Sequence, residues 1–292
     1  MMIVSKSEKT FYIINEIFLT LFVAVMMYPI IYVISASFSS PDAIRAGHVV
    51  LFPKEFTLET YKYILGDKDI WISYGNAFFY TIVGTLVCMI VTICGAYPMS
   101  KQVLPGKTFI LFAVAFTMWF GGGMIPMYLN FRDLGLLNSR TGYLIGFACD
   151  AFNFILLRNF FASIPRSLEE AAHVDGASEM TILTKIYIPL SFSAIATIAL
   201  FYAVAKWNTY LWPMILFTDD SKIPLQVLIK KMIVDLQVDE IKQASVDQGL
   251  ETMSSETAIY ASIVVSTVPM LILYPFVQKY FVKGVMVGAI KG

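Results

Sequence analysis

The segment that decides the fold is residues 164–189, which read IPRSLEEAAHVDGASEMTILTKIYIP. Pro165 cannot continue a preceding helix, so we expect that helix to end there. Ser167 and Glu170 have the S-x-x-E spacing of a capping box, which predicts that a new helix begins at Ser167. Gly176 can adopt the left-handed backbone angles that end a helix. The segment therefore predicts a short helix and a turn, placed between two far more apolar stretches of chain.

The overall composition is that of a membrane protein. Of the 292 residues, 58% are hydrophobic and 14% are charged, whereas soluble domains average roughly half apolar and a quarter charged. A chain with so little charge is expected to face lipid over part of its surface. The formal net charge of zero argues against a nucleic-acid partner, which requires a basic face. The three cysteines and two histidines lack the spacing of metal ligands, so we expect no metal site.

Six apolar stretches are long enough to cross a bilayer, which takes roughly 20 residues in a helix. We expect an all-α, multi-pass membrane protein with a cytoplasmic N-terminus of residues 1–12 and a transmembrane domain of residues 13–292. The first stretch follows two lysines, as a signal peptide would, but it is long and Ser35-Ala36-Ser37 is a weak cleavage site. We therefore expect it to be retained as a span. The expected spans are residues 13–35, 74–98, 108–130, 141–161, 188–217 and 257–279.

Basic residues predict the orientation of these spans. Inner and outer segments carry equal numbers of Lys and Arg when the N-terminus is placed inside. The two outer loops, residues 35–69 and 219–256, are long, and long loops bias orientation little. We therefore expect both termini, and the loop of residues 164–189, to be cytoplasmic. In the second outer loop, apolar residues recur at helical spacing from Leu225 to Leu236, which predicts an amphipathic helix.

The spacing within residues 164–189 resembles the cytoplasmic-loop signature of bacterial ABC importer permeases. That signature is Glu-Ala-Ala, three residues, Gly, nine residues and Ile-x-Leu-Pro, and all fixed positions are in register here except that Ile188 replaces Leu. The resemblance implies the six-helix fold of type I ABC importers. It also implies that residues 165–180 form a coupling helix that docks on an ATPase subunit. The residues that it assigns to coupling are Glu170, Ala171, Ala172, Asp175, Gly176, Ala177, Ile186 and Pro189.

Other segments resemble carbohydrate permeases of the maltose-transporter type. Residues 207–212, WNTYLW, resemble the fifth span of that group, and residues 278–292 resemble its C-terminus. Residues 120–126, FGGGMIP, with residues 134–138 and 158–161, are most similar to the subgroup for polysaccharides and complex oligosaccharides. The resemblance implies import of an oligosaccharide or polysaccharide fragment across a bacterial cell membrane. A different solute class in the same type of transporter is the alternative.

The resemblance also implies partners. These are a second, different permease subunit, two ABC ATPase subunits that hydrolyse ATP with Mg, and an extracytoplasmic solute-binding protein. The chain has no nucleotide motif of its own: Gly106-Lys107-Thr108 mimics the end of a phosphate-binding loop, but Lys101 stands where that loop needs its first glycine. We therefore expect a subunit that is not an enzyme and binds no cofactor.

A self-contained secondary transporter or a membrane enzyme is the rival class. A secondary transporter usually has several ionisable residues within its spans and a paired repeat. This chain has only Glu16, Asp150 and Lys206 in or near the spans, and no repeat is visible. A membrane enzyme needs clustered carboxylates or histidines, and the sequence shows no such cluster. Both rivals are therefore disfavoured.

Polar and aromatic residues of the fourth and fifth spans are candidates for the substrate path, because ligand sites place a few polar groups in an apolar pocket. A carboxylate such as Asp150 at the centre of a membrane helix costs roughly 2.5–3.5 kcal/mol. We hypothesise that Asp150 lines the sugar path; a satisfied contact near the outer interface is the alternative, and Lys206 either pairs with it or extends to one face. Trp207 and Trp212 fit interface anchoring better than ligand contact. The candidates are Asp150, Asn153, Trp207, Asn208, Tyr210 and Trp212.

Two glycine patterns predict local features of the spans. The triplet Gly121-Gly122-Gly123 predicts a break in the third span, with a gating role as the minority interpretation, because glycine frees the backbone. Gly142 and Gly146 form G-x-x-x-G in the fourth span, which predicts close helix packing.

Overall fold

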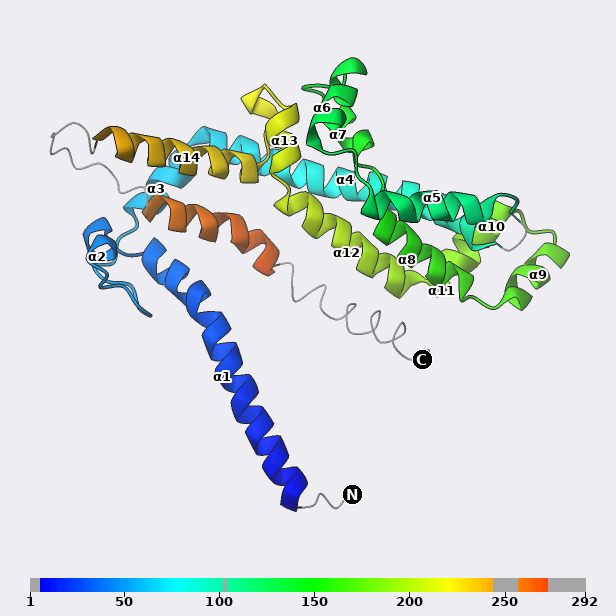
Figure 1. Cartoon of the computed structure of the whole chain (residues 1–292), viewed down its shortest axis with the longest axis horizontal. Helices are drawn as coiled ribbons and strands as arrows, with labels where there is room; N and C mark the ends of the chain where they lie inside the picture. Colours follow the sequence, from blue (N-terminus) through cyan, green and yellow to red (C-terminus); the bar gives the residue numbers. More distant parts are fainter. Residues whose placement is uncertain (1–5, 102–103, 244–256, 273–292) are drawn as a thin grey trace. The chain divides into compact units, whose positions relative to one another are not determined.

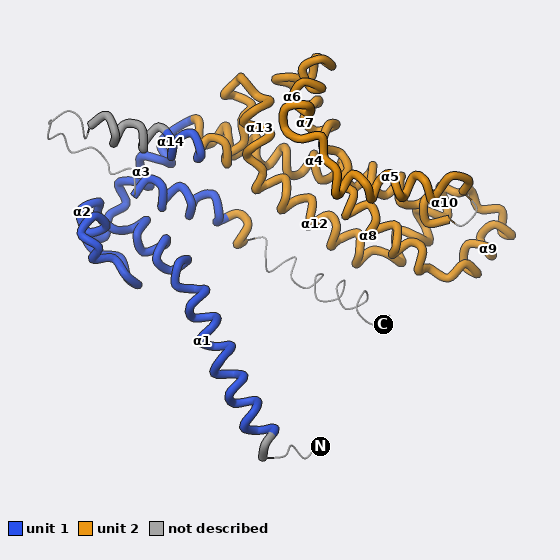
Figure 2. Tube along the Cα trace, viewed as in Figure 1, with its two compact units in different colours: residues 1–68, 229–268 blue, residues 69–228, 269–292 orange. Residues whose placement is uncertain are grey.

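The structure is a computed structural model that describes residues 6–101, 104–243 and 257–272. Every regular element in these ranges is a helix (Figure 1). The chain divides into two compact units, which are described separately (Figure 2). The first contains Met1–Lys68 and Ile229–Val268, and the second contains Asp69–Leu228 and Pro269–Gly292.

The first unit is built around the long helix α1, Lys6–Ser37. Its most apolar window has a mean hydropathy of 2.5 and is not buried against the rest of the chain. Such a helix needs lipid or another subunit around it, which agrees with the span expected at residues 13–35. At its C-terminal end, Ala36 packs with Ala43 and Ile44 in a small core. Among the described residues, this unit also contains α2, Pro41–Arg45, and α3, Glu59–Gly66, with parts of two further helices, α14, Leu225–Gln243, and the unlabelled Thr257–Ile272.

The second unit begins with α4, Lys68–Ser100, which is 33 residues long and contains the span expected at residues 74–98. Helix α8 packs against both α5 and α12 (Figure 1). The remaining elements are α5, Lys107–Trp119, α6, Met124–Asp133, α7, Arg140–Gly146, α8, Ala151–Ala162, α9, Arg166–Val174, α10, Glu179–Ile182, the π-helix η1, Leu183–Tyr187, α11, Ile188–Leu190, α12, Phe192–Asn208, α13, Leu211–Leu216, and the 3₁₀ helix η2, Asp220–Lys222.

Three of the expected spans are bent pairs of helices. Helices α5 and α6 meet at 117°, α7 and α8 at 53°, and the segment Glu179–Leu190 meets α12 at 83°. By length and composition, two helices of the described ranges can cross a membrane, and up to five spans result when each bent pair counts as one. The break expected at Gly121–Gly123 is confirmed, and Gly123 has a φ of 86° there. The expected spans 108–130, 141–161 and 188–217 are therefore not single straight helices.

Two predictions near the C-terminal part of the chain have different outcomes. The helix predicted from Leu225 onward is confirmed, since α14 spans Leu225–Gln243. The described part of the last expected span is the apolar helix Thr257–Ile272, which is shorter than a bilayer-crossing helix. Residues 273–279 of that span, and the C-terminal resemblance at residues 278–292, lie outside the described residues.

The close packing predicted from the G-x-x-x-G pattern is confirmed. A Cβ atom on Gly146 would lie 2.2 Å from Cζ of Phe131, and one on Gly142 would lie 2.7 Å from the carbonyl oxygen of Leu136. Only glycine allows α6 and α7 to approach this closely. The contact belongs to a buried aromatic cluster in which the Tyr80 and Tyr143 ring centroids are 5.2 Å apart.

Candidate functional site

Helix α9 forms the core of the signature segment, and its ends are fixed by backbone geometry. It begins at Arg166, with Pro165 at the N-cap and no side-chain capping bond. The capping box predicted at Ser167 and Glu170 is therefore wrong. The helix starts one residue earlier, because proline at the cap needs no N–H partner and Ser167 falls inside the first turn.

The predicted glycine end of α9 is confirmed. Gly176 has a φ of +75°, a left-handed angle that glycine adopts without a Cβ clash. The Gly176 N–H donates to the His173 carbonyl at 3.0 Å, and the Ala177 N–H donates to the Ala172 carbonyl at 2.9 Å. This pair of bonds is a Schellman motif, which satisfies the last carbonyls of the helix. The turn after α9 is thereby fixed without any partner subunit.

The signature residues separate into an inner and an outer set. Ala172, Ala177 and Ile186 pack against the core cluster that holds α4, α8 and η1 together. The outer set is exposed and comprises Glu170, Ala171, Asp175, Gly176 and Pro189. Large apolar side chains lie beside it, since Leu168 is 43%, Val174 88% and Met180 65% exposed. An exposed apolar surface on a short helix is typical of a protein-binding site.

An ionic cluster fixes the inner face of α9. The carboxylate of Glu169 contacts the ammonium group of Lys101 and accepts a hydrogen bond from the Tyr187 hydroxyl at 2.6 Å. Lys101 also lies 3.3 Å from the Glu179 carboxylate, which contacts the Tyr97 hydroxyl. Burial opposes ionisation of Glu169, but the bonds from Lys101 and Tyr187 outweigh it and lower the pKa of Glu169. The cluster joins α9 to the end of α4, to α10 and to η1.

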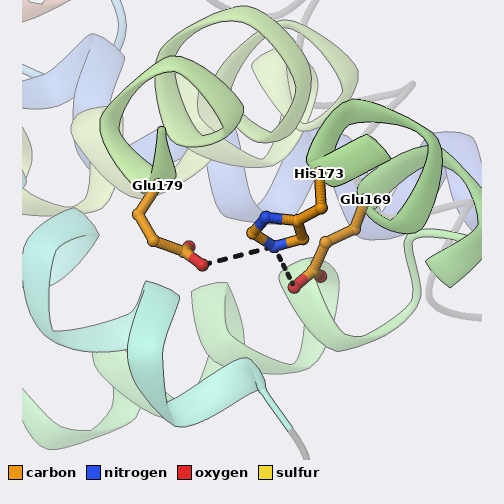
Figure 3. A group of neighbouring side chains, drawn as sticks. All are labelled: Glu169, His173 and Glu179. Carbon is orange, nitrogen blue, oxygen red and sulfur yellow. Dashed lines mark ion pairs between the residues drawn. The ribbon is translucent and has the colours of Figure 1, made fainter. Parts of the chain in front are cut away.

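His173 completes this cluster (Figure 3). Its Nε2 atom lies 3.8 Å from Glu169 and 3.4 Å from Glu179. One histidine and two carboxylates resemble a metal-ligand set, but the Lys101 ammonium already contacts both carboxylates. We therefore interpret the group as an ion network. The sequence analysis missed it; the available signal was the i, i+4 spacing of Glu169 and His173 on one helix face.

The second unit also contains a cavity of about 520 Å³. Pockets for small ligands measure roughly 300–1,000 Å³, so this one can hold a ligand. Its wall is mainly aromatic, with rings from Tyr143, Phe147, Phe152, Phe201, Tyr202 and Trp212. Its polar residues include Asp150, Asn153 and Lys206. Three sequence candidates, Asp150, Asn153 and Trp212, are therefore brought together.

Asp150 lies at the start of a helix, and its expected position at a helix centre is wrong. It is the N-cap of α8, and its side chain accepts the Asn153 backbone N–H at 2.9 Å. Its own N–H donates to the Tyr202 hydroxyl at 3.1 Å. The break between α7 and α8 follows from this cap, because a capping residue leaves helical backbone angles. An Asp just before an apolar helical run was a signal that the sequence already carried.

Lys206 does not take the first of its two expected arrangements, an ion pair with Asp150. It forms no ion pair with Asp150, and its Nζ donates to the Phe147 carbonyl at 2.9 Å. The ammonium lies 5.3 Å from the Tyr143 ring centroid, within the range of cation–π attraction. Lys206 thus lines the cavity, where the sequence analysis had not placed it.

The remaining sequence candidates do not line this cavity. Trp207 is 2% exposed and packs its ring 5.2 Å from that of Phe78 in α4. Asn208 donates its side-chain amide to the Val204 carbonyl at 3.0 Å. Tyr210 is 44% exposed. Trp207 and Asn208 are therefore accounted for by packing and by a hydrogen bond within the chain, without a ligand.

Comparison with known proteins agrees with this architecture. A polygalacturonan/rhamnogalacturonan transport system permease protein of Bacillus subtilis (strain 168), YtcP, is 41% identical over 278 residues, covering 94% of this chain and 96% of the relative. Protein LplC of the same organism is 37% identical over 289 residues, covering 99% and 97%. A solved bacterial ABC transporter involved in the import of the acidic polysaccharide alginate contains a chain with 48% identity and a TM-score of 0.86, covering 96% and 100%.

The family assignment rests on nearly the whole chain. Residues 1–287 match the family described as binding-protein-dependent transport system inner membrane component. The match includes both the α9 segment and the helices that surround the cavity. The chain therefore belongs to the binding-protein-dependent transport system inner membrane components, the permease subunits of ABC importers, and it is a transport subunit that is not itself an enzyme.

Proposed function

We propose that this chain receives force from an ATPase subunit through α9 and uses it to move a saccharide across the cell membrane. The observation that carries the proposal is that the outer set is exposed and includes residues on α9 and in the turn directly after it, while the ends of this helix are fixed within the chain. A docking helix must keep its shape under load, and the Schellman turn and ionic cluster both stabilise it. Leu168, Val174 and Met180 add apolar area to the surface that docks.

The assembly proposed is the one that the family uses. A second, different permease subunit completes the membrane path, and two ABC ATPase subunits bind ATP and Mg. An extracytoplasmic binding protein delivers the substrate. Six spans with both termini cytoplasmic place α9 on the ATPase side. Closure of the ATPases on ATP moves the docked helices together, and the spans change from inward-facing to outward-facing.

The substrate class proposed is an acidic oligosaccharide. Two observations support it. The relatives with 48% and 41% identity are described as serving alginate, an acidic polysaccharide, and polygalacturonan/rhamnogalacturonan. The cavity also combines aromatic walls with Lys206, a cation that can form a charge-assisted hydrogen bond with a carboxylate. A neutral oligosaccharide is the alternative within the same transporter type.

The coupling proposal is tested by copurification and uptake. The substitution Gly176→Asp forces a side chain onto a left-handed residue of the docking surface. We expect loss of ATPase association and of uptake. As a matched control, Gly47→Asp changes another exposed left-handed glycine, in the first unit and outside the docking surface; association should persist. Full association and uptake with Gly176→Asp would refute the coupling role of α9.

A further inference from the structure

The side chain of Lys206 is built into the cavity wall. A Cβ atom on Gly84 of α4 would lie 3.3 Å from both Cδ and Cε of Lys206. The missing side chain at Gly84 therefore makes room for the lysine stem between α4 and α12. The stem is held by packing, and the ammonium is presented at the cavity, where Lys206 is a lining residue. A charged group inside a membrane domain is costly, so a position prepared for it favours a functional role.

The hydrogen-bonding capacity of Lys206 is only partly used. An ammonium group has three N–H donors, and the described residues provide one oxygen acceptor within hydrogen-bond distance, the Phe147 carbonyl at 2.9 Å. The ring of Tyr143 contributes cation–π attraction, but a ring does not replace a charged acceptor. Asp150 does not pair with Lys206, since its side chain caps α8. The ammonium therefore keeps donors for a ligand.

Asn153 supplies the complementary group. Its residue is 6% exposed, and its Oδ1 atom has no hydrogen-bond partner among the described residues. A buried acceptor without a hydrogen bond is unfavourable, so a ligand hydroxyl that donates to it would remove that penalty. Asn153 lines the same cavity as Lys206. The cavity wall also contains the Asp150 carboxylate, whose Oδ1 accepts the Asn153 N–H. The Lys206 cation and the free acceptor, set among aromatic rings, match a molecule with a carboxylate, several hydroxyls and an apolar face.

We propose that this cavity is a subsite for a uronate unit, in which Lys206 binds the carboxylate and Asn153 accepts a hydrogen bond from a ring hydroxyl. The inference rests on the proposed function and deepens it, because it assigns acid selectivity to one residue of the permease. Aromatic rings such as Trp212 stack on the apolar face of the sugar. Specificity against neutral sugars follows, since a neutral ligand would leave the ammonium partly unpaired.

The test compares an acid with its neutral ester. The assembled transporter in lipid nanodiscs, without binding protein, is titrated with trigalacturonate and with its trimethyl ester. The two ligands differ in charge and by three methyl groups, so the change in their affinity ratio caused by a substitution, and not the ratio itself, reports the carboxylate interaction. Lys206→Gln removes the ammonium, Lys206→Arg retains the charge, and Lys62→Gln makes the same change at an exposed lysine of α3. Uptake of the acid in proteoliposomes with binding protein is a second measurement.

The expected results separate the roles of the two residues. Lys206→Gln should weaken acid binding about tenfold or more, because a charge-assisted hydrogen bond contributes roughly 1.5–3 kcal/mol, and ester binding should fall far less. Lys206→Arg should restore most of the acid-to-ester ratio, and Lys62→Gln should leave it unchanged. Asn153→Leu, which keeps the volume but removes the acceptor, should weaken both ligands equally.

Two outcomes overturn the proposal. An acid-to-ester ratio that survives Lys206→Gln would show that another group binds the carboxylate, while the proposed import of acidic saccharides would stand. A wild-type transporter that neither binds nor imports the acid would instead refute the proposed substrate class, and the uronate subsite with it. In that case ATPase association through α9 would be unaffected.

Discussion

The ammonium group of Lys101 bridges the carboxylates of Glu169 and Glu179, contacting the first and lying 3.3 Å from the second. Lys101 directly follows α4, and Glu169 belongs to α9. Both side chains are 19% exposed, so water screens the pair only partly. The Lys101 ammonium also lies 4.4 Å from the centre of the Tyr97 ring. The helix assigned to coupling is thus attached by charge to the end of a long membrane helix.

We expect Glu169→Gln and Lys101→Met to be strongly non-additive in stability. An exposed ion pair contributes roughly 0–1 kcal/mol, and breaking a buried one costs roughly 3–5 kcal/mol; this partly exposed pair should give a coupling energy of about 1–2 kcal/mol. A double-mutant cycle on the unfolding of the detergent-solubilised transporter measures it. Glu170→Gln, an exposed neighbour, is the control. Additive effects would mean that the contact contributes nothing.

The same pair predicts a pH dependence. The pKa of Glu169 is held below its ordinary value of 4.5, because bonds from Lys101 and Tyr187 outweigh the effect of burial. A carboxyl whose pKa falls on folding stabilises the folded state fully above its unfolded pKa, and the stabilisation is lost as the pH falls through the folded pKa. The stability difference between wild type and Glu169→Gln should shrink as the pH falls below about 5. Unfolding midpoints across this range measure it; a constant difference at lower pH would contradict the prediction.

Gly176→Ala should destabilise the turn after α9. A Cβ atom there meets no atom within 4 Å, so the cost is the left-handed backbone alone, roughly 1–2 kcal/mol. Gly176→Asn should cost less, because Asn tolerates this conformation. The measurement is retention of the ATPase during purification at rising temperature. Equal behaviour of the Ala and Asn variants would show that backbone strain at this turn does not matter.

Gly146→Ala should disrupt the packing of α6 on α7. The new methyl group would lie 2.2 Å from Phe131, and overpacking of this kind costs roughly 1–3 kcal/mol. Gly75→Ala in α4 is the control, because its Cβ meets nothing within 4 Å, and it should be neutral or stabilising. Thermal unfolding of both variants decides the matter. A neutral Gly146→Ala would mean that Phe131 moves aside at no cost.

Substitutions at Asp150 can distinguish its role as a helix cap from a role in transport. Asp150→Asn keeps a side-chain acceptor for the Asn153 N–H and should leave stability within about 0.5 kcal/mol, whereas Asp150→Ala should cost about 1 kcal/mol. Unfolding measurements test the cap, and uptake is recorded on the same proteins. Unchanged uptake and substrate preference in Asp150→Asn would show that the carboxylate has no role in the substrate path. Equal stability of the Asn and Ala variants would show that the side-chain cap contributes no stability.

Several features followed from the sequence because they depend on local physics. The apolar stretches of α1 and α4 predict long helices that lipid can surround, since hydropathy and length are properties of consecutive residues. The glycine end of α9 and the break at Gly121–Gly123 were predicted for the same reason, because glycine alone adopts left-handed angles without strain. The fixed spacing from Glu170 to Pro189 indicates the family by itself, because it depends on the local sequence alone.

Other features were decided by the tertiary structure. The start of α9 at Arg166 and the position of Asp150 at a helix cap depended on where neighbouring helices end. Lys101 and Glu169 are 68 residues apart along the chain, and nothing in either local sequence predicts their contact.

The cavity is the clearest case. Lys206 reaches it only because Gly84, far away in the sequence, leaves space for its stem. The local sequence determines which segments are helical and apolar, since helical hydrogen bonds and hydropathy depend on consecutive residues. Which charges meet, and which acceptors such as Asn153 are left free for a ligand, was settled only when distant helices packed, because close packing fixes side-chain positions that no single segment controls.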